Sequence, residues 1–166
     1  ASDGVGIDFP QLLLEGLQPR LVVIDEGLRP LYHAAASAAA NYSLTLFAIA
    51  EELYRRAGDN DEDARNTVTR FMLQSIERAS LRGPKASVTG PVVRGDLDVV
   101  REQMQLVEAK APELYNAFRS LSEATALMFT DSWNELWGEF FQRDAEEKDH
   151  SVNGSPWAQR GQSAGE

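Results

Sequence analysis

Residues 30–57 read PLYHAAASAAANYSLTLFAIAEELYRRA, and this stretch predicts one long helix. Pro30 suits the first turn of a helix, and Gly58 suits the C-terminal cap. The stretch is rich in alanine and is interrupted by polar residues, so we expect a soluble core helix rather than a membrane span. Apolar side chains recur along it at helical spacing and form a candidate core stripe of Leu31, Ala35, Ala38, Tyr42, Ile49 and Leu53.

The sequence after this stretch predicts more helices. A second helix is expected over residues 61–81, because the acidic residues 61–63 suit a first turn. A third follows a loop with two Gly-Pro pairs at residues 83–91 and is expected to be capped by Asp96. A fourth begins near Pro112, and its helical pattern continues to Phe141. We therefore predict an all-α bundle of four or more helices, in which the first and last are long.

Each later helix has a predicted buried side. The second is expected to bury Val68, Phe71, Met72, Ser75, Ile76 and Ala79. The third is expected to bury Leu97, Val100, Met104 and Val107. In the fourth, a heptad-like seam is expected at Leu114, Phe118, Leu121, Thr125 and Met128.

The two ends of the chain differ from its middle. Residues 9–14 suggest a short helix and residues 20–24 a short strand. Beyond Lys148 the composition turns to Ser, Gly, Asn and Gln without a period, which predicts a disordered tail. The expected organisation is an N-terminal segment over residues 1–27, a helical domain over residues 28–148 and a tail over residues 149–166.

Composition narrows the function classes. The 166 residues suit about one domain, and 16 Lys and Arg against 26 Asp and Glu give a net charge of −10. This balance argues against nucleic acid or an anionic membrane as the partner. The sequence has no Cys and two His, so we expect no disulfide, no Cys nucleophile and no metal site. We find no secretory signal and expect a cytoplasmic protein.

Three polar residues on the first helix are candidates for chemistry. His33, Ser37 and Asn41 are spaced i, i+4 and i+8, so they share one helix face apart from the apolar stripe. One interpretation is a cleft, with His33 as general acid or base and the Asn41 amide orienting a substrate. The other is a set of structural hydrogen bonds to a loop, and spacing alone favours it.

A second candidate group lies in the sequence TGPVVRGD at residues 89–96. The Arg94 guanidinium is suited to binding a carboxylate or phosphate, and we take Thr89 and Arg94 as candidate substrate-binding residues. The alternative gives the glycines and Pro91 turn roles, with Arg94 holding a helix C-terminus and Asp96 capping the next helix.

Two further patterns concern cofactor and partner. Gly4-Val5-Gly6 resembles the start of a dinucleotide-binding motif, but Phe9 occupies the place of its third glycine and no strand precedes it. We therefore find no nucleotide cradle in these residues. The aromatic residues Trp133, Trp137, Phe140 and Phe141 predict either a dimer contact or ordinary packing within the domain.

Two of these motifs together resemble a known family. LYHAAA at residues 31–36 with AANY at residues 39–42, and TGPVVRGD about fifty residues later, are similar to the hallmarks of an uncharacterised family. In that family a Rossmann-like NAD(P)-binding domain precedes a helical domain of unknown function, which resembles the C-terminal domains of 6-phosphogluconate dehydrogenase-like enzymes. The similarity spans residues 22–128, and it implies that residues 1–27 are the trailing edge of the Rossmann-like domain or a linker.

The resemblance implies a function for the helical domain. It would supply part of a substrate cleft and a dimer contact, with the nicotinamide near the start of the first helix and with His33, Ser37 and Asn41 facing the cleft. One departure is that related hydroxyacid dehydrogenases carry a Lys four residues before the helix Asn, where this chain has Ser37. A larger departure is the missing glycine-rich fingerprint, which places NAD(P) mainly on a domain absent from this chain.

We therefore expect the helical substrate-binding and dimerisation domain of an NAD(P)-dependent oxidoreductase that acts on a small hydroxy or keto acid or an imine. His33 would move the proton and Asn41 would orient the substrate. Ser37, Thr89 and Arg94 would bind the substrate, and a homodimer would form through Trp133, Trp137 and Phe140. The alternative is a stand-alone, non-catalytic helical module for dimerisation or partner docking.

Overall fold

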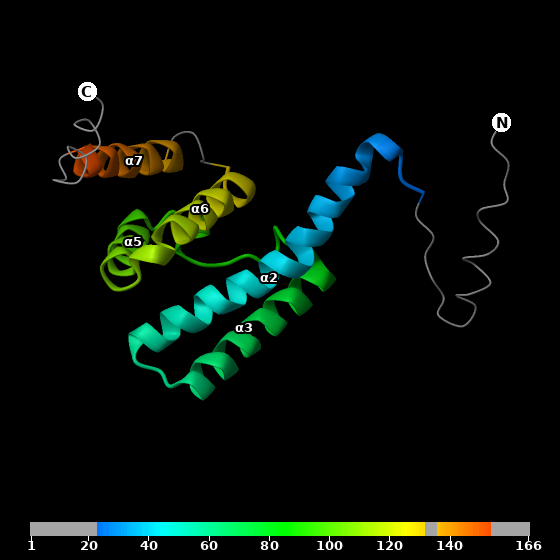
Figure 1. The fold of residues 1–166 in the computed structure, drawn as a ribbon, viewed down its shortest axis with the longest axis horizontal. Coiled ribbons are helices and arrows are strands. Elements are labelled where there is room, and N and C mark those ends of the chain that lie inside the picture. Colours follow the sequence, from blue (N-terminus) through cyan, green and yellow to red (C-terminus); the bar gives the residue numbers. More distant parts are fainter. Residues whose placement is uncertain (1–22, 132–135, 154–166) are drawn as a thin grey trace, which may run out of the picture. The chain divides into compact units, whose positions relative to one another are not determined.

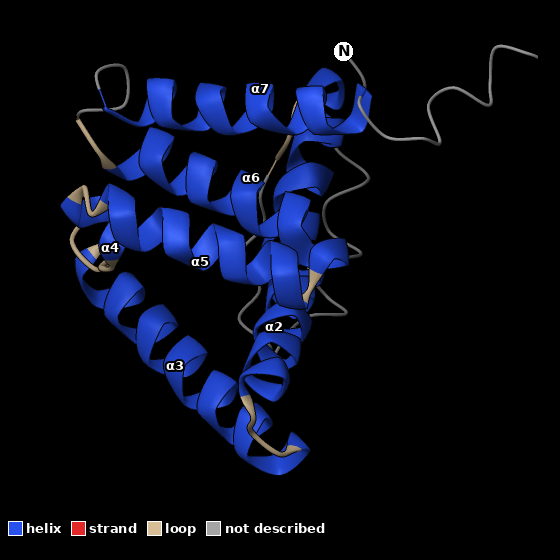
Figure 2. Ribbon diagram, turned by 90° about the vertical axis from the view of Figure 1, so that its left-hand side faces the viewer, coloured by secondary structure: helices blue, strands red, loops and turns tan. Residues whose placement is uncertain are grey.

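The described part of the chain consists of helices and the turns between them. The computed structural model describes residues 23–131 and 136–153, and no strand occurs among them (Figure 2). The all-α prediction is confirmed. The elements are η1 (Glu26–Leu28), α2 (Arg29–Ala57), α3 (Asp61–Arg82), α4 (Pro91–Arg94), α5 (Leu97–Lys110), α6 (Pro112–Phe129) and α7 (Gly138–Asn153) (Figure 1).

The predictions for the N-terminal segment fall largely outside the described residues. The short helix expected at residues 9–14 lies there, as does most of the strand expected at residues 20–24. The described end of that strand, Val23 and Ile24, has no regular structure. Asp25 follows, and its carboxylate accepts the Gly27 N–H at 2.8 Å, which caps η1.

The chain divides into two compact units within α2, Ala1–Leu44 and Thr45–Glu166. The core stripe predicted on α2 is confirmed only in part. In the larger unit, Ile49 and Leu53 are half-buried and Leu53 packs against the core. In the smaller unit, the other members of the stripe are exposed. Leu31 is 68% exposed and Tyr42 61%, and Ala35 and Ala38 are exposed as well. This expectation of burial was wrong, because a helix face is buried only where another element covers it. No described segment of the smaller unit covers this one.

In the larger unit, α3 is covered mainly near its start. The Asn60 side chain caps the helix by accepting the N–H groups of Glu62 and Asp63 at 3.1 and 3.0 Å. Ala64 and Val68 are buried near this end, where the ion pairs Arg65–Glu51 at 2.9 Å and Arg55–Asp61 at 3.6 Å tie α3 to α2.

Farther along α3, the predicted buried side is only partly confirmed. Val68 is buried, and Met72 and Ala79 are half-buried. Phe71, Ser75 and Ile76 are exposed, so their predicted burial was wrong. They lie beyond the end of α3 that the ion pairs hold, and helical periodicity does not show how far along a helix its neighbour reaches.

The core of the larger unit lies between α5, α6 and α7, which lie side by side in Figure 2. A single residue, Ala111, joins α5 to α6. On α5, the predicted residues Val100, Met104 and Val107 are buried, and Leu97 packs against them. The buried cluster consists of Val100, Met104, Val107, Ala111, Tyr115, Ala126, Trp137, Phe140 and Phe141.

The seam predicted for α6 is confirmed only in part. Leu114 and Phe118 pack against the core, whereas Leu121 and Met128 are exposed. The buried residues of the helix are Tyr115, Ser122 and Ala126. Ser122 and Ala126 are small, so neighbouring helices can pack closely over them. The Ser122 hydroxyl is satisfied by donating to the Phe118 carbonyl at 2.9 Å, which removes the cost of burying it.

Two helix ends also differ from prediction. Asp96 lies at the N-cap position of α5, but its side chain makes no cap hydrogen bond and instead pairs with Arg94. α6 ends at Phe129, because Thr130 is extended and its hydroxyl donates to the Ala126 carbonyl at 2.7 Å. The helix expected to run on to Phe141 is therefore broken. α7 begins at Gly138 and continues past the predicted boundary at Lys148 to Asn153.

Candidate functional site

The three polar candidates on α2 lie in the smaller unit. His33 and Asn41 are exposed, and Ser37 is half-buried. All three lie within one continuous helix, so the i, i+4, i+8 spacing does place them on one face. Successive members are about 6 Å apart along the helix axis. A row of an imidazole, a hydroxyl and an amide can both exchange a proton and orient a polar ligand.

The second predicted group, Thr89 and Arg94, lies in the larger unit around α4. Thr89 is exposed and precedes Gly90, whose φ of 118° is in a region that side chains rarely adopt. Arg94 is the last residue of α4, and its Nε donates to the Asp96 carboxylate at 2.9 Å. The predicted turn roles are observed at Gly90, in the bend before α4, and at Gly95, which ends α4 with a φ of 77°, whereas Pro91 begins α4. The predicted partner of Arg94, a helix C-terminus, is replaced by Asp96.

A cavity that the sequence did not indicate lies in the larger unit, between α5, α6 and α7. Its volume is about 370 Å³. The lining mixes charged and apolar side chains, namely Leu97, Arg101, Met104, Gln105, Glu108, Tyr115, Leu136, Glu139, Phe140, Arg143 and Asp144. Its arginines have neighbours of opposite charge, since Arg101 pairs with Asp98 at 2.8 Å and Arg143 lies 3.7 Å from Glu139.

Tyr115 and Asp144, which line this cavity, belong to a linked group of polar side chains. The Tyr115 hydroxyl donates to Asp144 at 2.5 Å, and Arg119 Nε donates to the other oxygen of Asp144 at 2.8 Å. Arg119 also donates to the Phe141 carbonyl at 2.6 Å and lies over the Phe141 ring. Burial, and then the hydrogen bond to Asp144, raises the pKa of Tyr115. The phenol therefore keeps its proton at neutral pH, and the group ties α7 to α6.

Sequence reasoning missed this group because its members are far apart in the chain. Arg119 and Asp144 are 25 positions apart and lie on different helices. Helical spacing relates only residues three or four positions apart. The single local signal is the pair Arg119 and Glu123, which are four positions apart and form an ion pair at 2.9 Å.

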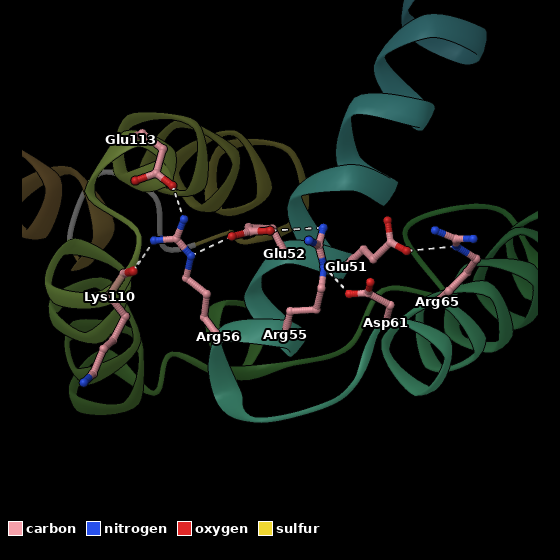
Figure 3. A network of polar contacts seen from close by, with 8 residues as sticks. All are labelled: Glu51, Glu52, Arg55, Arg56, Asp61, Arg65, Lys110 and Glu113. Carbon is pink, nitrogen blue, oxygen red and sulfur yellow. Dashed lines mark hydrogen bonds and ion pairs between the residues drawn. The ribbon is translucent and has the colours of Figure 1, made fainter.

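A second polar network joins the C-terminal end of α2 to the corner between α5 and α6 (Figure 3). Arg56 donates from Nε to Glu52 at 2.7 Å and from Nη2 to Glu113 at 2.5 Å. Its remaining terminal nitrogen donates to the carbonyl of Lys110, the last residue of α5. Such terminal carbonyls lack a partner inside their own helix, so Arg56 caps α5 from another helix.

The charges of this network reinforce one another. The hydrogen bond from Arg56, followed by the attraction of Arg55 and Arg56, lowers the pKa of Glu52 below its usual value. The same bond raises the pKa of Arg56. The network ties α2 to the corner between α5 and α6, because Arg56 bonds groups on both sides of this junction (Figure 3).

The aromatic residues predicted as a dimer contact lie in the core where they are described. Trp137 is 0% exposed, and its ring lies 5.5 Å from Phe140 and 5.7 Å from Phe141, measured between centroids. Packing within the domain is therefore the interpretation that burial favours for Trp137 and Phe140. Trp133 lies outside the described residues.

Two other kinds of feature do not occur among the described residues. No cluster of three or more His, Asp or Glu in residues 23–131 and 136–153 is placed to hold a metal ion. Within the same ranges, no helix combines the length and the apolar character needed to cross a bilayer.

The fold thus defines an all-helical domain with a polar row on one helix and a separate aromatic core. A family model described as Domain of unknown function (DUF2520) matches residues 1–125. The chain belongs to this family. The match supports the part of the sequence resemblance that named a helical domain of unknown function. Neither curated proteins nor solved structures gave a match.

Proposed function

We propose that this chain is the helical substrate-binding and dimerisation domain of an NAD(P)-dependent oxidoreductase acting on a small hydroxy or keto acid or an imine. The observation that carries the proposal is the row of His33, Ser37 and Asn41 on one face of α2. An imidazole at the accessible surface is suited to protonating an oxygen or nitrogen that receives a hydride. The amide of Asn41 and the hydroxyl of Ser37 can each donate to and accept from a polar substrate.

Among the described residues, groups suited to NAD(P) are found only for its nicotinamide end, where the hydride is transferred. The polar row offers groups to a nicotinamide and a substrate, but α4, which follows Gly90, has only 4 residues. A helix that short has little dipole with which to hold a pyrophosphate. NAD(P) supplies or accepts the hydride, and its phosphates would be held by residues outside the described part.

Thr89 and Arg94 are proposed to bind the anionic group of the substrate. The Arg94 guanidinium is paired with Asp96 in this structure, and the side chains are 62% and 40% exposed. An exposed pair of this kind contributes at most about 1 kcal/mol, so a substrate carboxylate can displace Asp96 at little cost. Arg94 is also the residue type that binds carboxylates through two parallel hydrogen bonds.

The test is the oxidation of NADPH or NADH by the full-length protein in the presence of a panel of keto acids and imines. Replacing His33→Ala should reduce kcat at least about 10²-fold if His33 transfers the proton. Asn41→Ala should mainly raise KM. The matched control is Ser43→Ala on the same helix, where the hydroxyl donates only locally to the Ala39 carbonyl at 2.7 Å. An unchanged rate for His33→Ala would remove His33 from the mechanism.

A second function is favoured by the exposed apolar face of α2. A helical module without catalytic activity that dimerises or docks a partner would present such a surface. Cofactor binding discriminates between the two functions. Quenching of NADPH fluorescence by the full-length protein supports the oxidoreductase, whereas association without any cofactor binding supports the interaction module.

A further inference from the structure

We propose that two copies of this chain pair through one face of α2, antiparallel, around a twofold axis that passes between Ala35 and Ala38. The α2 apolar face is defined as Leu31, Ala35, Ala38 and Tyr42. The proposal deepens the dimerisation part of the proposed function and rests on it. The sequence predicted a dimer contact through aromatic residues that include Trp137 and Phe140, but both are buried in the core. The α2 apolar face takes their place as the proposed dimer interface.

The first argument is exposure. Leu31 and Tyr42 are 68% and 61% exposed, and Ala35 and Ala38 are exposed between them. Apolar area in contact with water is unfavourable by about 25 cal/mol per Å². An apolar helix face that no other part of its own unit covers is available for association.

The second argument is charge, and it favours a second copy as the occupant. The chain carries a net charge of −10, so two copies repel each other when most of their surfaces approach. Residues 30–50 contain no Asp, Glu, Lys or Arg. Along this part of α2, two identical copies can meet without bringing like charges together. A basic partner would gain more by binding where the acidic residues lie.

The third argument is the order of side-chain sizes along the face. Large, small, small and large side chains follow one another, and the spacings are 4, 3 and 4 residues. This order reads the same in both directions, which is what an isologous contact about a twofold axis requires. In the antiparallel arrangement, Leu31 lies against the partner's Tyr42, and Ala35 lies against the partner's Ala38. Small residues at the centre let the two helices approach closely.

This pairing leaves the polar row accessible. His33 and Ser37 follow Leu31 and Ala35 by two residues each. Two residues correspond to a rotation of about 200° around a helix, so these side chains point away from the α2 apolar face. One face of α2 would hold the second copy while another faces the substrate.

The first experiment measures the oligomeric state of the full chain by analytical ultracentrifugation over a range of concentrations. We expect a dimer for the wild type and at least a 10²-fold weaker dimer for Ala38→Asp, because a charge would be buried without a partner. The matched control is Ala40→Asp, which changes the net charge equally but lies on the opposite side of the helix. Circular dichroism of both variants checks that their helix content is equal.

The second experiment tests the antiparallel arrangement. The chain has no Cys, so Leu31→Cys and Tyr42→Cys each introduce a single reactive thiol. A short bifunctional maleimide should link Leu31→Cys chains to Tyr42→Cys chains in a mixture. It should not link either variant to itself, because like positions would lie about 16 Å apart along the helix axis.

Each contrary result overturns the proposal. A wild type that is monomeric at all concentrations shows that no second copy covers the face. Equal weakening by Ala38→Asp and Ala40→Asp shows that net charge, not this face, controls association. Links within each single variant show a parallel pair. None of these measurements involves cofactor or substrate, so failure here leaves the test of His33 in hydride transfer unaffected.

Discussion

The α2 apolar face and the core between α5, α6 and α7 look alike in the sequence but differ in the structure. Each carries large apolar side chains at helical spacing. Trp137 and Phe141 are 0% and 1% exposed, whereas Leu31 and Tyr42 are 68% and 61% exposed. The difference is whether a described part of the same unit supplies a complementary surface. Periodicity therefore predicts which face needs a neighbour, and not where the neighbour comes from.

The largest expected effect is loss of the core. Replacing Trp137→Ala removes a fully buried ring that packs against Phe140 and Phe141, and it should lower the free energy of unfolding by about 3–5 kcal/mol. Urea denaturation followed by circular dichroism measures this loss. Tyr42→Ala on α2 is the comparison, and in dilute samples of monomer it should change the free energy by less than about 0.5 kcal/mol. Equal losses would mean that the two regions are covered alike.

A medium effect is expected at the link between α6 and α7. Asp144→Asn weakens the bonds to Tyr115 and Arg119 and leaves the partly buried guanidinium without its main counter-charge. We expect a loss of about 1–3 kcal/mol in the free energy of unfolding. Asp131→Asn is the matched control, because that side chain is 97% exposed and lies 3.4 Å from Lys85. If the two variants lose the same amount, the link does not hold α7.

The Tyr115 hydroxyl should give a smaller effect that depends on pH. Its pKa is raised in the folded chain above the usual 10.0, so the phenol contributes stability that is fully present below pH 10 and is lost as pH rises beyond it. Tyr115→Phe should cost about 1 kcal/mol at neutral pH. The difference from wild type should shrink between about pH 10 and 11. A difference that stays constant over this range would show that ionisation of Tyr115 is not linked to folding.

The smallest effect is expected at the exposed network of Arg56, and it should appear in acid. In the folded chain the pKa of Glu52 is lowered below its usual value of 4.5. The contribution of this carboxylate to stability is therefore fully present above pH 4.5, and it is lost as the pH falls through the lowered pKa. Glu52→Gln should therefore lower the melting temperature slightly at neutral pH, and the deficit should disappear in acid. Glu102→Gln, an exposed glutamate on α5, is the control. A deficit that persists in acid would place the role of Glu52 elsewhere.

Local patterns were sufficient for the class of fold and for much of its core. The start of α5 near Asp96, the start of α6 at Pro112 and the burial of Val100, Met104 and Val107 were all predictable. These features depend on residues close together in the sequence. The break after Phe129 was missed, although Thr130, Asp131 and Ser132 are residue types that favour helix caps over helix interiors. The apolar residues on either side of them keep a helical spacing, which favoured one continuous helix.

The candidate site was predictable only in its local part. His33, Ser37 and Asn41 could be grouped because a single helix sets their spacing. The cavity beside α7 and the bonds of Arg119 to Asp144 required knowledge of which helices meet. The same limit applies to Arg56, whose partners at Lys110 and Glu113 are 54 and 57 residues away.

The extent of the family match has a practical consequence for anyone who expresses this domain. The match ends at residue 125, but Ala126, Trp137, Phe140 and Phe141 belong to the buried core. A fragment cut at the family boundary would leave the α5–α6 surface in water, and such fragments bind hydrophobic dyes and aggregate. Proteins expressed for crystallisation or binding assays should therefore retain the chain at least to Asn153, the end of α7.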